Sequence, residues 1–244
     1  MKISLADPAQ FKESINIISD LVNEATFNIS KEGVELVAMD PANVAMVIFK
    51  MFNNCFSEYD TNDVKLSVNL SDLNKILRRV HPKDILTLEL GDNQLILKIK
   101  DDVARTFNLP IIELEEKEQK IPDLKFPISI VMPSSMLTGA IEDADIVAES
   151  VMFEADKGIF TLFASGDLSQ AKIEMKEGEN IKIEASEKVK AKYSIEYLKK
   201  MIGGAKLSEN VEVRFKNDYP LRLDFKVIDK MSLGFILAPR VDAD

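Results

Sequence analysis

The stretch Val68–Val80, VNLSDLNKILRRV, combines a hydrophobic stripe with a cluster of positive charge. Its apolar residues recur at the i, i+3, i+4 and i+7 spacing of one helix face: Leu73, Ile76, Leu77 and Val80. Ser71 or Asp72 is placed to cap such a helix. The cations fall off the apolar face: Lys75, Arg78 and Arg79. The stretch therefore predicts a helix with a buried back and a basic, exposed front.

The rest of the chain is acidic, with 31 Lys and Arg against 41 Asp and Glu and a formal net charge of -10. An acidic balance argues weakly against nucleic acid as a partner. That objection weakens if the positive charge is gathered on one surface, as this helix indicates.

The length of 244 residues suits one or two domains with sizeable cores. Cys55 is the only cysteine and His81 the only histidine, so no intrachain disulfide and no Cys/His zinc site is expected. The N-terminus, MKISLADPAQ, turns polar too early for a signal peptide, and there is no apolar run of 18 residues. We expect a soluble intracellular protein without a membrane span.

The chain contains an internal repeat. Each half opens on a helix, continues through a glycine-centred hairpin and a further strand, and then has a second, basic helix followed by strands. The spacing is steady: Gly33 to Gly158 is 125 residues, Leu73 to Tyr197 is 124, and Val68 to Lys192 is 124. We therefore predict two similarly folded domains, residues 1–112 and 126–244, joined by the charged connector 113–125.

Antiparallel strands with helices on one face define an α+β fold. Such sheets leave unpaired edge strands, which proteins cover or use for association. Two like domains with free edges can close head to tail into a ring.

The chain resembles the archaeal and eukaryotic replication sliding clamps, the proliferating cell nuclear antigen family. The resemblance runs from Met1 to the C-terminus and is carried by several segments: SDLVNEATFNI at 19–29, EGVELVAMDPANVAMV at 32–47, NLSDLNKIL at 69–77, KIPDL at 120–124 and LAPRV at 237–241. It implies a trimeric ring, of identical or related subunits, with sheets outside and four helices per subunit around duplex DNA.

The resemblance assigns the basic helix faces to DNA. The expected sequence-independent phosphate contacts are Lys12, Lys75, Arg78, Arg79, Lys83, Lys199, Lys200 and Lys206. The helix 134–145 departs from this pattern, because it has no basic residue and carries Glu142, Asp143 and Asp145. These carboxylates could instead bind a metal, but they lie in a helix and lack the glycine and distal glutamate of a calcium loop.

The resemblance also implies a hydrophobic pocket for partner peptides, next to the connector and the C-terminal tail. Its expected residues are Met39, Val44, Met46, Ile121, Pro122, Pro220, Ile236, Leu237, Ala238 and Pro239. Plain core packing is the alternative for Met39 and Met46.

The subunit contact is expected between two edge strands. Phe107, Leu109 and Ile111 stand on the last strand of the first domain, and Ala171, Ile173 and Met175 stand on a strand of the second. The alternative is that both are edge strands of a monomer whose charged side chains prevent pairing with another chain.

No catalytic residue, metal or cofactor is predicted. His81 has no second histidine or cysteine to work with, Cys55 has no evident activating base, and Gly203-Gly204 lacks the lysine and serine of a phosphate loop. The predicted function is that of a non-enzymatic DNA polymerase processivity factor. The alternatives are a metal-dependent nuclease, an acidic protein-interaction scaffold and a checkpoint-type clamp subunit.

The expected partners are double-stranded DNA, further clamp subunits, and DNA polymerase, clamp loader, flap endonuclease and ligase through short peptide motifs. The abundance of Lys, Glu and Ile with sparse Cys and His favours an archaeal source, and hence a cytoplasmic, nucleoid-associated location. A eukaryotic source would imply the nucleus.

Overall fold

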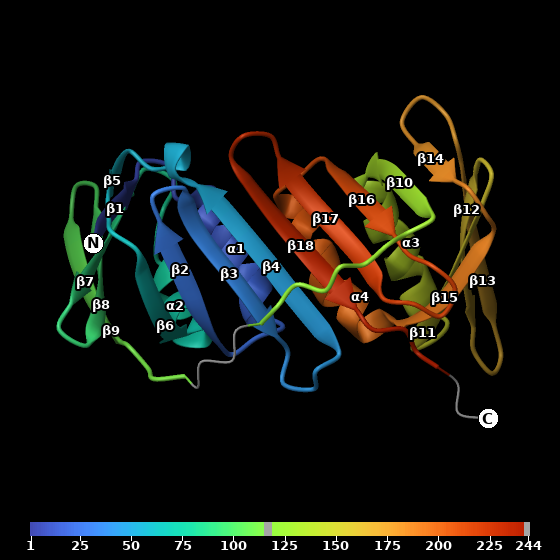
Figure 1. Cartoon of the computed structure of the whole chain (residues 1–244), viewed down its shortest axis with the longest axis horizontal. Coiled ribbons are helices and arrows are strands. Elements are labelled where there is room, and N and C mark those ends of the chain that lie inside the picture. Colours follow the sequence, from blue (N-terminus) through green and yellow to red (C-terminus); the bar gives the residue numbers. More distant parts are fainter. Residues whose placement is uncertain (115–118, 242–244) are drawn as a thin grey trace. The chain divides into compact units, whose positions relative to one another are not determined.

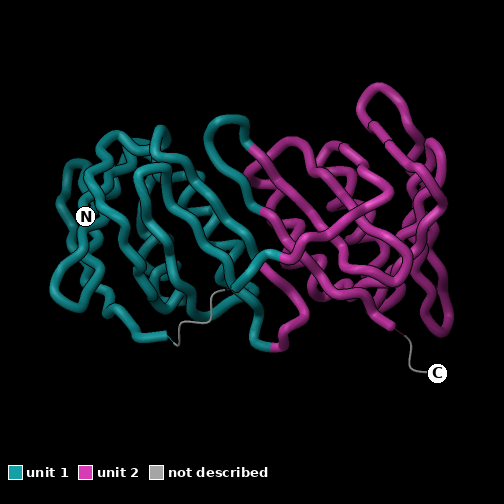
Figure 2. The backbone as a smooth tube through the Cα atoms, in the orientation of Figure 1, with its two compact units in different colours: residues 1–41, 47–121, 227–233 teal, residues 42–46, 122–226, 234–244 magenta. Residues whose placement is uncertain are grey.

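The computed structural model describes residues 1–114 and 119–241, which form two compact units (Figure 2). Unit 1 comprises residues 1–41, 47–121 and 227–233, and unit 2 comprises residues 42–46, 122–226 and 234–244. The main change from one unit to the other falls between Ile121 and Pro122, inside the segment 113–125 that the sequence suggests as a connector.

Unit 1 is built on antiparallel strands in two sheets. One has the order β5-β1-β7-β8-β9, and in the other β4, β3, β2 and β6 are successive neighbours. The strands are β1 (Lys2–Leu5), β2 (Glu24–Ser30), β3 (Gly33–Met39), β4 (Ala45–Phe52), β5 (Glu58–Asp60), β6 (Val64–Asn69), β7 (Ile85–Gly91), β8 (Gln94–Lys100) and β9 (Ala104–Pro110). A short 3-10 helix, η1 (Asn53–Cys55), follows β4.

Unit 2 repeats this plan. In one of its sheets β14, β10, β16, β17 and β18 are successive neighbours, and the other has the order β13-β12-β11-β15. The strands are β10 (Ile128–Pro133), β11 (Ser150–Asp156), β12 (Ile159–Ser165), β13 (Gln170–Lys176), β14 (Lys182–Ala185), β15 (Val189–Ser194), β16 (Asn210–Arg214), β17 (Leu221–Val227) and β18 (Met231–Leu237).

Each unit carries two helices that pack against one another on one side of its strands (Figure 1). They are α1 (Ala9–Ser19) and α2 (Leu70–Leu77) in unit 1, and α3 (Ser134–Asp145) and α4 (Ile195–Met201) in unit 2, where the 3-10 helix η2 (Ile202–Lys206) extends α4. Equivalent helices start 125 residues apart, at Ala9 and Ser134 and again at Leu70 and Ile195. The predicted duplication of one α+β fold is confirmed.

The units have separate cores made by the inward residues of alternating strands. In unit 2, the ring of Phe153 packs edge-on against Phe160, Tyr193 and Phe215 at centroid distances of 5.3 to 5.8 Å. Tyr193 is fully buried, and its hydroxyl donates to the carbonyl oxygen of Tyr219 at 2.7 Å. Burial raises the pKa of this hydroxyl, so it stays a donor.

The cap of α2 differs from the sequence prediction. Asn69 is the N-cap, with extended backbone, and its side-chain oxygen accepts from the backbone N–H of Asp72 at 3.0 Å. Ser71 and Asp72 therefore lie inside the helix rather than before it. The reason is that β6 runs directly into α2 without a loop. Hydrophobic spacing alone does not locate the start of a helix that follows a strand directly.

Candidate nucleic-acid and partner interfaces

The basic front of α2 is exposed, as its sequence predicts. Leu70, Leu73 and Leu77 are buried against the sheet, whereas Lys75, Arg78 and Arg79 are exposed. Arg78 and Arg79 follow the last helical residue, Leu77, and Lys83 is exposed in the loop beyond. The Lys75 ammonium lies 2.7 Å from the Asp72 carboxylate, one turn earlier.

Two cations hold the carboxyl end of α2 in place. The Lys12 ammonium, from α1, donates to the carbonyl oxygen of Val80 at 2.8 Å. The guanidinium of Arg105, on β9, donates to the carbonyl oxygen of Arg79 at 2.8 Å and to Asp84 at 2.5 Å. Lysine and arginine bonds of this kind satisfy the free carbonyls of a helix end.

Asp84 is the buried centre of this arrangement. It is 2% exposed, and one carboxylate oxygen accepts from the backbone N–H of His81 at 2.7 Å. This hydrogen bond, together with the Arg105 guanidinium, lowers the pKa of the Asp84 carboxyl. The loop that carries Arg79 and Lys83 is thereby tied to β9.

The equivalent face of unit 2 contains more negative charge. Lys199 on α4 lies 2.6 Å from Asp145 at the end of α3, and Lys200 lies 3.4 Å from Glu196. Glu142 and Asp143 are exposed on α3, and Lys206 is exposed in η2. The acidic helix and the basic helix of this unit are therefore paired with each other.

The two predicted contact strands lie at sheet edges. β9 pairs only with β8 and β13 only with β12 among the strands of the described part of the chain. Phe107 and Ile173 are half-buried, on the same side of their sheets as the buried Leu97 and Leu162 opposite them. Of the other predicted contact residues, Leu109 and Met175 are buried, Ala171 is half-buried, and Ile111 is half-buried beyond the end of β9.

The predicted peptide-site residues differ widely in exposure. Ile121 and Pro122 are exposed, and Met39, Val44, Pro220, Ala238 and Pro239 are half-buried. Met46 and Ile236 are each 7% exposed and Leu237 is fully buried, so these three side chains contribute mainly to the core. Within unit 2, the backbone N–H of Ala238 donates to the carbonyl oxygen of Val44 at 2.9 Å, which places the start of the tail beside the loop 42–46.

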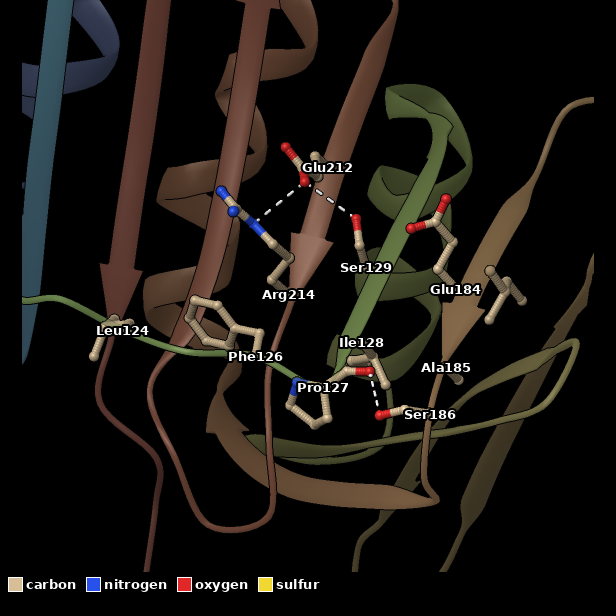
Figure 3. A pocket seen from close by; sticks show the side chains of 11 residues that line it. Leu124, Phe126, Pro127, Ile128, Ser129, Glu184, Ala185, Ser186, Glu212 and Arg214 are labelled. Carbon is tan, nitrogen blue, oxygen red and sulfur yellow. Dashed lines mark hydrogen bonds and ion pairs between the residues drawn. The ribbon is translucent and has the colours of Figure 1, made fainter.

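Sequence reasoning missed an open groove of about 770 Å³ in unit 2, where Phe126 and Pro127 lie beside β10, β14 and β16 (Figure 3). The Arg214 guanidinium lies 5.7 Å from the centroid of the Phe126 ring and 3.4 Å from Glu212. Ser129 donates to Glu212 at 3.1 Å from the neighbouring strand. The alternation of charged residues along β16 and β17 was the available signal for this polar sheet face.

The structure adds three further observations. Within residues 1–114 and 119–241, no group of three acidic, histidine or cysteine side chains is placed to hold a metal, and no helix is long and apolar enough to cross a membrane. The Cys55 thiol lies against the carbonyl oxygen of Lys230 at 3.2 Å, and burial raises its pKa. A raised pKa makes a thiol less reactive.

Two units of one plan, each with a basic helix on the helical side of antiparallel sheets, define the clamp class of α+β proteins. The proliferating cell nuclear antigen N-terminal domain matches residues 1–119, and the C-terminal domain of the same family matches residues 120–240. The chain belongs to the proliferating cell nuclear antigen family.

Archaeal relatives agree with this assignment. A DNA polymerase sliding clamp of Nanoarchaeum equitans is 34% identical over 99% of this chain and 100% of its own length. Sliding clamps of Thermococcus gammatolerans and Pyrococcus horikoshii are 35% and 33% identical over 96% of this chain and 95% of theirs. The family resemblance drawn from the sequence, and with it the sliding-clamp function, is confirmed.

Proposed function

We propose that this protein is the processivity factor of a replicative DNA polymerase and acts as a trimeric ring around duplex DNA. The observation that carries the proposal is the placement of its exposed cations. In a chain of net charge -10, basic residues occupy the front of the second helix in both units, 125 residues apart. Such a surface contacts phosphates without reading bases.

The ring is proposed to close through β9 of one copy and β13 of the next. Both strands have an unpaired edge, and an extended edge pairs readily with another strand. Head-to-tail contacts of one kind close into a ring when the rotation between copies allows it. Phe107, Leu109 and Ile111 would then face Ala171, Ile173 and Met175 of the neighbour.

The mechanism is topological and non-enzymatic. A closed ring keeps its partner near the primer end by linkage to the DNA, which raises the partner's effective concentration without tight binding. A protein that slides along DNA needs few phosphate contacts, and the acidic charge on the rest of this chain is consistent with weak binding. Ring opening is assigned to a separate ATP-driven loader, because the sequence contains no phosphate-binding loop.

The partners are proposed to be polymerase, clamp loader, flap endonuclease and ligase, each binding through a short peptide. Exposed Ile121 and Pro122 and half-buried Ala238 and Pro239 offer apolar surface for an extended segment. The archaeal relatives favour an intracellular location on the nucleoid.

The test uses DNA with and without ends. The unmodified chain, its loader and its polymerase are supplied with a primed circular template and with the same template linearised. We expect long products on the circle and loss of stimulation on the linear form, because a ring slides off free ends. Equal stimulation on both templates would show that the chain is a scaffold that binds polymerase without encircling DNA.

A further inference from the structure

The two units differ in the charge of their helical faces, and this difference bears on how DNA is held. In unit 1, residues 9–20 and 70–84 contain five Lys and Arg against four Asp and Glu. The equivalent residues of unit 2, 134–145 and 195–209, contain three Lys against five Asp and Glu. The helices and following residues are therefore net positive in unit 1 and net negative in unit 2.

Some of these cations already have a partner in both units. Lys199 is bound by Asp145 at 2.6 Å, and Lys200 lies within ion-pair distance of Glu196. In unit 1, the Lys75 ammonium is likewise paired with Asp72 and the Lys12 ammonium with the carbonyl of Val80. Each of these ammonium groups already donates to a partner, so a phosphate gains less from it than from a cation without one.

Three cations of unit 1 lack such a carboxylate. Arg79 and Lys83 have no side-chain partner among the described residues, and Arg78 has only the neutral side-chain oxygen of Asn16, at 3.4 Å. All three are exposed, and they occupy six residues at the end of α2. Arg105 and Lys12 hold the backbone of this segment at Arg79 and Val80.

Packing explains why unit 2 has no counterpart to Arg79. With the offset of 125 residues between α2 and α4, Arg78 and Arg79 correspond to Gly203 and Gly204. A Cβ atom at Gly204 would lie 2.4 Å from the ring of Phe225, so no longer side chain fits there. The structure of unit 2 thus excludes a cation at this position.

We propose that DNA is contacted chiefly through unit 1, at Arg78, Arg79 and Lys83, and that Asp145 restrains Lys199 from binding phosphate. Unit 2 is then the weakly binding half of the DNA path, which limits friction while the ring slides. The inference rests on the proposed encirclement of DNA and specifies which residues of that surface bind it.

The experiment measures binding of the full-length protein to a fluorescein-labelled duplex at a series of KCl concentrations. Each phosphate contact contributes about 0.9 to the slope of log affinity against log salt. In a ring of three, we expect Arg79→Gln to lower this slope by about 2.7, one contact per subunit. Lys199→Gln removes the same charge, and we expect it to leave the slope nearly unchanged.

Asp145→Asn is expected to raise the affinity several-fold and to steepen the slope, because it releases Lys199. Glu142→Gln is the matched control, since it removes one negative charge from the same helix without touching Lys199. The increase in DNA affinity caused by Asp145→Asn should disappear in the double variant Asp145→Asn/Lys199→Gln.

Equal slopes for Arg79→Gln and Lys199→Gln would overturn the inference, as would equal gains for Asp145→Asn and Glu142→Gln. Both results leave the ring itself intact, because the unmodified chain still distinguishes circular from linear DNA. Equal stimulation of polymerase by the unmodified chain on circular and linear templates would overturn the proposed function together with this inference.

Discussion

At the scale of single residues, Asp224 is a buried charge held by two arginines. It is 4% exposed, and its carboxylate accepts from Arg222 at 2.8 and 3.1 Å and from Arg214. Burial by itself would raise the pKa of this carboxyl, but the hydrogen bonds and charges of the two arginines outweigh burial and lower it. The group therefore stays ionised inside the sheet face beside the groove of unit 2.

Replacing Asp224 by Asn is expected to lower the free energy of unfolding at neutral pH by about 1–3 kcal/mol, because two guanidinium groups lose their counter-charge. Because the folded pKa lies below the ordinary value of 3.8, this contribution is present above pH 3.8 and is lost as the pH falls through the folded pKa. Urea unfolding of both proteins from about pH 6 to about pH 3 measures the difference.

Glu154→Gln is the control for this prediction. Its carboxylate forms a partly exposed ion pair with Lys188, and such surface pairs contribute little to stability. A stability difference between the unmodified protein and Asp224→Asn that already shrinks well above pH 3.8 would show that another group causes the effect.

At the scale of secondary structure, the notable feature is the tie between β9 and the end of α2. An edge strand has one neighbour, so its free side frays easily. Arg105 counters this by joining β9 to Asp84 and to the carbonyl of Arg79. The proposed subunit contact and the proposed DNA contact are therefore held by one side chain.

Asp84→Asn is expected to increase hydrogen exchange of the backbone amides in residues 79–84 and 104–110, because Arg105 loses its charged partner and His81 a strong acceptor. Mass spectrometry of peptides from these segments measures the change. Glu89→Gln is the control, since it removes the surface ion pair with Lys98 in the same sheet. Equal exchange in both variants would refute a specific role for Asp84.

At the scale of the whole molecule, the unpaired edges of β9 and β13 set the expected assembly. Three chains of 27.4 kDa give a ring of about 82 kDa. Light scattering coupled to size exclusion is expected to report this mass for the unmodified chain. A monomer would indicate that different, related subunits complete the ring.

Ile173→Lys is expected to yield monomers of 27.4 kDa, because it introduces a charge on the helix-facing side of the edge strand β13. Thr161→Lys introduces the same charge one strand further in, on the opposite face of the sheet, and should leave the trimer intact. A trimeric Ile173→Lys protein would exclude this edge as the subunit contact.

Much of the fold was predictable because its signals are local. The period of Leu73, Ile76 and Leu77 predicts α2, and alternation on both sides of Gly33 and Gly158 predicts the hairpins. The short strands β5 and β14 were missed, because three or four residues carry too little pattern. The prediction that each half opens on a helix was wrong, because strands β1 and β10 precede α1 and α3. The exposure of Lys75, Arg78 and Arg79 was predicted correctly, although the helix ends at Leu77 and the two arginines follow it.

Spatial pairing could not be predicted in this way. Lys199 and Asp145 are 54 residues apart, and Arg105 and Asp84 are 21 apart, so no sequence period connects them. The tertiary structure also placed Leu237 in the core rather than on the surface.

The amino-acid sequence by itself determined the duplicated α+β plan, the basic faces of two helices and the family, since each depends on periods and segments within the chain. Only the tertiary structure decided which cations already have a carboxylate partner and which strands are left at an edge. The physical reason is that ion pairs and strand edges depend on distances between segments that are remote in sequence.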